Sequence, residues 1–176
     1  ASAEDDISRL FISTESANSV FYADVNHSAT PLFGTNFAFN VVPDLSASAN
    51  LGAPRSIAVH RDSGRVYAAI QGQGIFSAGI EEGSMMTNAP VTGVPSIMIH
   101  ENYFFYTDQY VDIETNYLFF GAIDADGAFT LATNAPVSIG GFHNGVTPEP
   151  YMAVHPTNNH VYFIDAPGEN LMKSEN

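Results

Sequence analysis

The chain repeats itself. A short apolar segment that ends in histidine occurs three times, and each copy has a proline a few residues before it. The copies are Ile57-Ala58-Val59-His60, Ile97-Met98-Ile99-His100 and Met152-Ala153-Val154-His155. An internal repeat constrains the fold strongly, because each copy forms the same small unit and buries its apolar face against its neighbours.

Further strand-like segments follow each histidine after a polar turn. The second segment of the repeat is aromatic and occurs at residues 10–13, 66–70, 104–108 and 161–165. A third recurs at residues 20–23, 75–78, 118–121 and 171–174. A less regular fourth segment recurs at residues 37–42, 84–87 and 128–133. Apolar residues run or alternate over four to six positions and then break, which indicates strands and not helices.

Four short strands per repeat, separated by turns rich in Gly, Asn and Asp, are typical of the blades of a β-propeller. The sequence therefore predicts an all-β fold of four-stranded antiparallel blades. An all-β sandwich is the structural alternative, although sandwich strands do not show this four-strand self-similarity.

The repeats divide the chain into a tail, residues 1–8, and a propeller region, residues 9–176. The expected units are a partial blade at 9–45, full blades at 54–92 and 95–136, and a partial blade at 150–176. Together they hold 14 expected strands, about three and a half blades. Because a bare strand edge promotes association, we expect a partial ring, or a ring completed by another chain, such as half of a seven-bladed ring. A four-bladed ring, in which the first and last blades share strands, is the alternative.

The charge balance excludes some classes of partner. The formal charge is −14, from 5 Lys and Arg against 19 Asp and Glu. Such a chain lacks the cations that nucleic acids and anionic lipid surfaces require. The absence of cysteine excludes disulfides and Cys-ligated zinc. The first residues, Ala1-Ser2-Ala3, indicate a processed or an artificially trimmed N-terminus. Removal of a secretory signal is one interpretation, and an extracellular location is the expectation.

Two of the aromatic strands resemble the Tyr-Trp-Thr-Asp strand of YWTD propellers: Phe105-Tyr106-Thr107-Asp108 and Tyr162-Phe163-Ile164-Asp165. The proline-led strands that end in His60, His100 and His155 resemble the first strands of NHL and lactonase-like propellers. The resemblance covers about residues 9 to 176 and implies the propeller superfamily without selecting one family. Members of this superfamily are secreted binding modules or calcium-dependent hydrolases and lactonases.

One end of the predicted blades carries the longer loops, and we call it the loop face. In a four-stranded meander the loops between second and third strands emerge there, together with the connections from one blade to the next. The residues expected to form a ligand or partner surface on this face are Arg55, Ser96, Tyr110, Phe142, His143, Asn144 and Tyr151. The loops on this face also bring several acids, so we expect it to be acidic.

Asp108, Asp112, Glu114 and Asn116 lie within one of these loops. Calcium takes six to eight oxygen ligands, which carboxylates and amides supply. These four residues are therefore the candidate metal site, with Ca²⁺ as the ion. The alternative is a solvated acidic rim that holds no ion.

Hydrolysis needs a histidine paired with a carboxylate at the mouth of the propeller. His143 and Glu149 are the candidates for that pair, and an exposed loop histidine is the alternative. The repeated His60, His100 and His155 occupy the same blade position, where side chains usually cap the turn. A ring of metal ligands is the alternative role for these three residues.

The sequence favours a secreted, non-enzymatic propeller that acts as an interaction or assembly module through its acidic loop face. Its expected partner is a protein or further copies of a propeller chain, so an oligomer is expected. Two alternatives stay open: a calcium-dependent lactonase or esterase-like hydrolase, and a carbohydrate-binding lectin that uses loop aromatics.

Overall fold

The computed structural model describes residues 7–28, 38–93, 96–110, 115–141, 152–155, 160–165 and 170–173. These residues form fifteen strands and two short 3-10 helices. The strands make four antiparallel sheets, and none of them closes on itself within the described residues. The expected all-β class is therefore confirmed. None of the helices in the described residues is long and apolar enough to cross a membrane.

The first sheet has three strands, in the order β1-β2-β3. Its elements are β1 (Ile7–Thr14), β2 (Ser19–Asn26) and β3 (Asn40–Val41). β1 and β2 form a hairpin that pairs Ile7 with Asn26 and Thr14 with Ser19. Two 3-10 helices, η2 (Pro43–Leu45) and η3 (Ala47–Ala49), then lead to the second sheet.

The second sheet is a four-stranded meander in sequence order. Its elements are β4 (Pro54–His60), β5 (Arg65–Ile70), β6 (Gly74–Ala78) and β7 (Met86–Ala89). The tight turns between its strands use Gly64 and Gly72, which have φ of 65° and 67°. Glycine adopts this left-handed conformation at no steric cost, so these positions fix where the hairpins reverse.

The third sheet repeats the same meander. Its elements are β8 (Ser96–His100), β9 (Tyr103–Tyr110), β10 (Thr115–Ile123) and β11 (Phe129–Leu131). A further strand, β12 (Val137–Gly141), also pairs with β10. β11 pairs with one half of β10 and β12 with the other half, so two short strands together flank one long strand.

The fourth sheet has the order β13-β14-β15. Its elements are β13 (Met152–Val154), β14 (Val161–Asp165) and β15 (Asn170–Lys173).

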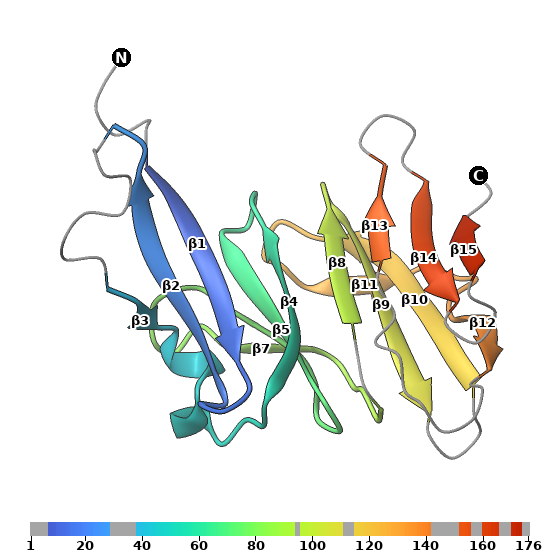
Figure 1. Ribbon diagram of the computed structural model, residues 1–176, viewed down its shortest axis with the longest axis horizontal. Helices are drawn as coiled ribbons and strands as arrows, with labels where there is room; N and C mark the ends of the chain where they lie inside the picture. Colours follow the sequence, from blue (N-terminus) through green and yellow to red (C-terminus); the bar gives the residue numbers. More distant parts are fainter. Residues whose placement is uncertain are drawn as a thin grey trace.

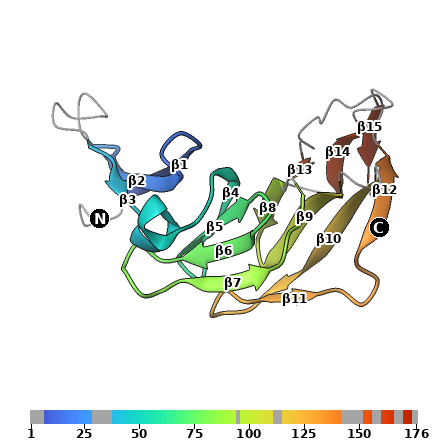
Figure 2. The ribbon, with the colours of Figure 1, turned by 90° about the horizontal axis from the view of Figure 1, so that it is seen from below.

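The four sheets stand side by side along an open arc. Figure 1 shows β1, β4, β8 and β13 next to one another, and each neighbouring pair is in contact. Figure 2, seen from below, places these strands on the inner side of the arc and β7 and β11 on the outer side. Ser56 joins the second and third sheets at the inner side, because its hydroxyl accepts from the Ile97 N–H at 3.1 Å and lies 3.3 Å from the Ile97 carbonyl.

The core lies between the sheets in two layers. One layer, between the first and second sheets, is built around Val20, Leu45 and Ile70. The other, between the second and third sheets, is built around Tyr67 and Phe104. β5 contributes to both layers: Tyr67 and Ala69 face the third sheet, whereas Val66, Ala68 and Ile70 face the first.

The repeat predicted most strands, and the outer strands are where the structure differs. Each expected first, second or third strand overlaps a strand of the structure. The expected outer strand at 84–87 instead spans Met86–Ala89, and that at 37–42 contributes only Asn40–Val41. β12 lies in a segment expected to be a connection between blades. The strand count in the described residues is consequently fifteen and not 14.

Candidate functional site

The loop face brings together turns from two sheets, as the strand order predicts. The β1–β2 turn, the β5–β6 turn and the start of β4 meet through the side chain of Arg55. Its Nη1 lies 2.7 Å from Glu15 Oε1, and its Nε and Nη2 donate to Gln71 Oε1 at 3.1 and 2.9 Å. The Arg55 side chain is 30% exposed and the Glu15 side chain 63% exposed. This cluster of three side chains is polar, held in place and open to solvent.

A second set of contacts fixes the loop face next to this cluster. Gln73 Oε1 accepts a hydrogen bond from the Gly52 N–H at 3.1 Å. The Gly72 N–H donates to the Gly93 carbonyl at 3.3 Å. The β5–β6 turn is therefore tied both to the segment before β4 and to the segment after β7.

Asp108 is buried at this face, with 1% of its surface exposed. Its Oδ1 accepts from the Gly93 N–H at 2.8 Å, and its Oδ2 accepts from the Thr92 N–H at 3.1 Å. The Thr92 hydroxyl lies 3.3 Å from the same Oδ2. Because both carboxylate oxygens accept from backbone amides, Asp108 holds the connection between β7 and β8 against β9.

The side chains of the other members of the predicted calcium group lie outside the described residues, so their distance from Asp108 stays open. Asp112 and Glu114 lie outside the described residues, and Asn116 belongs to β10 with its side chain outside them. Within the described ranges, no three His, Asp or Glu side chains come together as a metal would need.

The remaining predicted partner-face residues are only partly covered by the described residues. Ser96 begins β8 and is half-buried. Tyr110 ends β9, and its side chain lies outside the described residues. The other predicted residues, among them both members of the catalytic pair, also lie outside them: Phe142, His143, Asn144, Glu149 and Tyr151.

The first of the repeated histidines caps its turn, as expected for that position. His60 is 2% exposed, and its Nδ1 lies 2.8 Å from the Ser63 hydroxyl in the β4–β5 turn. Its Nε2 lies 3.0 Å from Asn102 Oδ1 in the β8–β9 turn, so the same ring joins the second and third sheets. Sequence reasoning missed this second contact. Of the other two repeat histidines, His100 is half-buried and His155 is exposed.

Exposed acids in the described residues lie mainly away from the loop face. Six of them lie in the β4–β5, β6–β7, β8–β9 and β10–β11 turns, at the opposite end of the sheets: Asp62, Glu81, Glu82, Glu101, Asp124 and Asp126. The loop face has Glu15, which is paired with Arg55, and the buried Asp108. Asp112, Glu114 and Glu169, which the sequence also places on the loop face, lie outside the described residues, so an acidic loop face stays a prediction.

Tyr67 supplies a further contact between the second and third sheets. Its hydroxyl donates to the Gly127 carbonyl at 2.7 Å, across 60 residues of sequence. The side chain is fully buried, and this burial raises the pKa of the phenol above its ordinary value of 10.0. The phenol is held protonated as a donor, so its role is structural.

No protein-family profile matches this chain. No curated protein sequence matches it either.

Proposed function

We propose that the chain is a propeller-type scaffold that works without catalysis, as an interaction and assembly module. In this proposal the four sheets are blades, and β4, β8 and β13 are their first strands. β5 and β9 are second strands, each flanked by a first strand that ends in histidine. β1 stands where β5 and β9 stand in the repeat, because it is followed by β2 as β5 is followed by β6.

The observation that carries the proposal is the exposure of the first sheet. Within the described residues β1 pairs only with β2, so its other edge offers backbone hydrogen-bonding groups. Four of the nine exposed large apolar side chains in the described residues belong to this sheet or its approach: Ile7, Leu10, Phe39 and Val41. We call these four residues the end patch. Ile7 and Leu10 lie on β1 itself, whereas Phe39 and Val41 lie at β3, on the other edge of the sheet. Exposed apolar side chains on a bare strand edge favour association with another strand.

The proposed occupant of this edge is a strand from a further copy of the chain. In the second and third sheets, the corresponding edge of the second strand is covered by β4 and β8, which come from the repeat itself. A further copy supplies strands of that same type, so the chain contains the sequence that its own bare edge fits.

The loop face is the proposed surface for a protein partner of a different kind. Its support is the cluster of Glu15, Arg55 and Gln71, which is fixed by mutual hydrogen bonds before any partner arrives. Binding to such a prepared polar surface loses less side-chain freedom than binding to a mobile one. Asp108 supports the same surface from beneath, through the backbone amides of Thr92 and Gly93.

Sedimentation equilibrium over a wide range of concentrations tests the assembly proposal. The wild-type chain is expected to self-associate, and the double variant Leu10→Lys, Val41→Lys is expected to be monomeric at the same concentrations. Val59→Lys is the matched control, since Val59 is 46% exposed but lies in β4 of the second sheet, outside the end patch. A wild-type chain that stays monomeric, or a double variant that associates like the control, would refute the proposal.

A further inference from the structure

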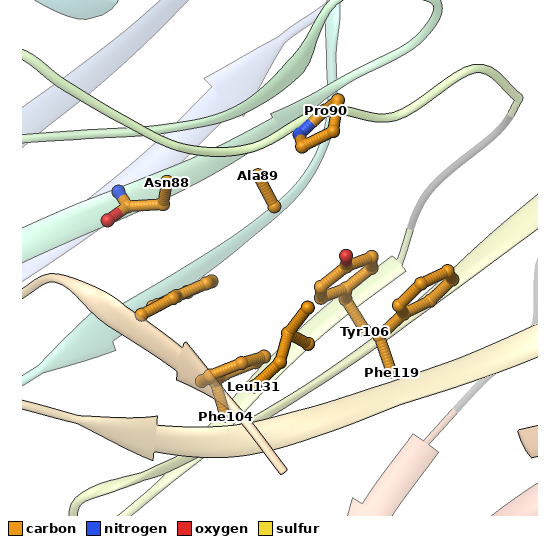
Figure 3. A pocket seen from close by; sticks show the side chains of 8 residues that line it. Asn88, Ala89, Pro90, Phe104, Tyr106, Phe119 and Leu131 are labelled. Atoms are coloured by element: carbon orange, nitrogen blue, oxygen red, sulfur yellow. The ribbon is translucent and has the colours of Figure 1, made fainter. Parts of the chain in front are cut away.

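An apolar cavity of about 240 Å³ opens between the second and third sheets. On one side it is bounded by the end of β7, with Asn88 and Ala89, and by Pro90. On the other side are the aromatic rings of Phe104 and Tyr106 from β9 and Phe119 from β10. Figure 3 shows Asn88, Ala89 and Pro90 along one wall, with Phe104, Leu131, Tyr106 and Phe119 opposite them.

The rings that bound the cavity are nearly parallel to one another. Phe129 stacks on Phe104 with centroids 3.9 Å apart and planes 5° apart. Tyr106 stacks on Phe119 with centroids 4.6 Å apart and planes 2° apart. Cross-strand pairing fixes this second stack, because Phe119 and Tyr106 are directly opposite in the β9–β10 ladder. The cavity therefore has a rigid aromatic wall.

A close approach of β11 to β10 shapes the outer side of the cavity. Gly121 is opposite Phe104 in the β9–β10 ladder and opposite Leu131 in the β10–β11 ladder. A Cβ at Gly121 would overlap the Thr130 carbonyl oxygen and press on the Phe104 ring, so only glycine permits this approach. Leu131 is 47% exposed and Pro90 is also exposed, whereas Phe104 is fully buried. The mouth thus lies at Leu131 and Pro90, on the outer side of the arc.

Asn88 contributes a polar side chain to the wall, but its amide group is turned away from the rings. The amide nitrogen donates to the Ser77 hydroxyl at 2.8 Å, and Oδ1 is buried. Figure 3 shows this amide group directed away from Phe104, Tyr106 and Phe119. The surface that faces the rings is therefore mostly apolar.

We propose that this cavity is a binding site for a small planar aromatic molecule of one ring or two fused rings, such as indole. An apolar cavity of roughly 150 Å³ holds benzene, so this larger cavity accommodates a molecule of that size. The ligand ring packs among Phe104, Tyr106 and Phe119. Binding sites for small molecules are mostly apolar and lined by aromatic side chains.

Indole is the probe for the test, because the chain contains no tryptophan. Indole excited at the red edge of its absorption is then the only emitter, and its emission moves to shorter wavelength in an apolar cavity. Titration of the wild-type chain is expected to show saturable binding of indole. Benzofuran has the same shape without the N–H, and its affinity, measured by competition, is expected to be similar, because the ring-lined cavity binds through apolar contact.

One variant tests the site directly. Ala89→Leu fills the cavity from its buried wall, so indole binding is expected to fall at least about tenfold. Thermal unfolding checks that this variant is folded at the temperature of the titration. Lack of saturable binding by the wild-type chain, as with a cavity that holds water alone, would overturn the site. So would undiminished binding by a folded Ala89→Leu variant.

Discussion

The Glu15 carboxylate lies 2.7 Å from the Arg55 guanidinium, and this ion pair joins the β1–β2 turn to the first strand of the second sheet. Both groups are partly exposed, so solvent and salt weaken their attraction. A double-mutant cycle of Glu15→Gln and Arg55→Met is expected to give a coupling energy of about 0.2 to 1 kcal/mol. Urea unfolding measures each free energy of unfolding.

The Arg9–Asp24 pair is the control for this cycle, since its two residues are opposite in β1 and β2 and join no two sheets. High salt is expected to reduce both coupling energies. If Arg55→Met costs no more than Glu15→Gln, the contact of Arg55 with Gln71 adds nothing, contrary to the geometry.

His60 is predicted to matter more for stability than the other histidines of the repeat. Replacement by alanine leaves Ser63 and Asn102 without their buried partner, and the expected cost is about 1 to 3 kcal/mol. His155→Ala is the matched control, because His155 has the same place in the repeat but is exposed. Equal losses of unfolding free energy in the two variants would contradict the role assigned to His60.

Asp108 is predicted to stabilise the chain with or without calcium. In Asp108→Asn one carboxylate oxygen is replaced by the NH2 of an amide, which cannot accept a hydrogen bond from the N–H of Thr92 or Gly93. We expect a loss of about 1 to 3 kcal/mol in unfolding free energy. The loss should be the same in excess calcium and in excess chelator. A loss that appears only with calcium would instead support the metal role predicted from the sequence.

Tyr67 is predicted to make stability fall at alkaline pH. Burial raises the pKa of its phenol in the folded chain above 10.0, so the folded state holds this proton more tightly than the unfolded state. Its contribution is complete below pH about 10 and is lost as the pH rises towards the folded pKa. Tyr67→Phe, which keeps the ring, is expected to be less stable than wild type near pH 7 by about 1 kcal/mol.

The stability gap between wild type and Tyr67→Phe should therefore narrow above pH about 10. Chemical unfolding of both proteins from neutral to alkaline pH measures it. The other tyrosines titrate in both proteins, so the difference isolates Tyr67. A gap that stays constant across this range would show that the Tyr67 proton is bound equally in both states.

The repeat made the inner strands predictable because each carries an apolar core and a polar turn in the same order. The outer strands were less predictable, since their sequences are less regular and their partners decide where they begin. β12 is Val-Ser-Ile-Gly-Gly and has a proline just before it, features that also suit a connection. It becomes a strand because β10 is longer than β11 and leaves Thr115 to Leu118 to be paired.

The site was predictable in topology and less so in chemistry. Strand order was enough to place Arg55 on the same face as the β1–β2 and β5–β6 turns. Sequence spacing does not reveal that residues 92 and 93 fold back onto Asp108, so the sequence suggested only a metal role for this buried carboxylate. It also does not reveal the cavity between the second and third sheets, because that cavity depends on how far apart the two sheets stand.

The double-sided burial of β5 has a consequence for how this chain finds its native pairing. In a strand with one wet face, a slip by one residue exposes apolar side chains and is penalised at once. β5 has apolar neighbours on both faces, so the same slip moves Tyr67 and Ala69 into one apolar layer and Val66, Ala68 and Ile70 into the other. Size and polarity must therefore select the register: the Tyr67 ring needs the room beside Phe129, and its hydroxyl needs the Gly127 carbonyl. Burial of apolar side chains alone therefore does not distinguish the native register of β5 from a register shifted by one residue. The contacts of Tyr67 make that distinction.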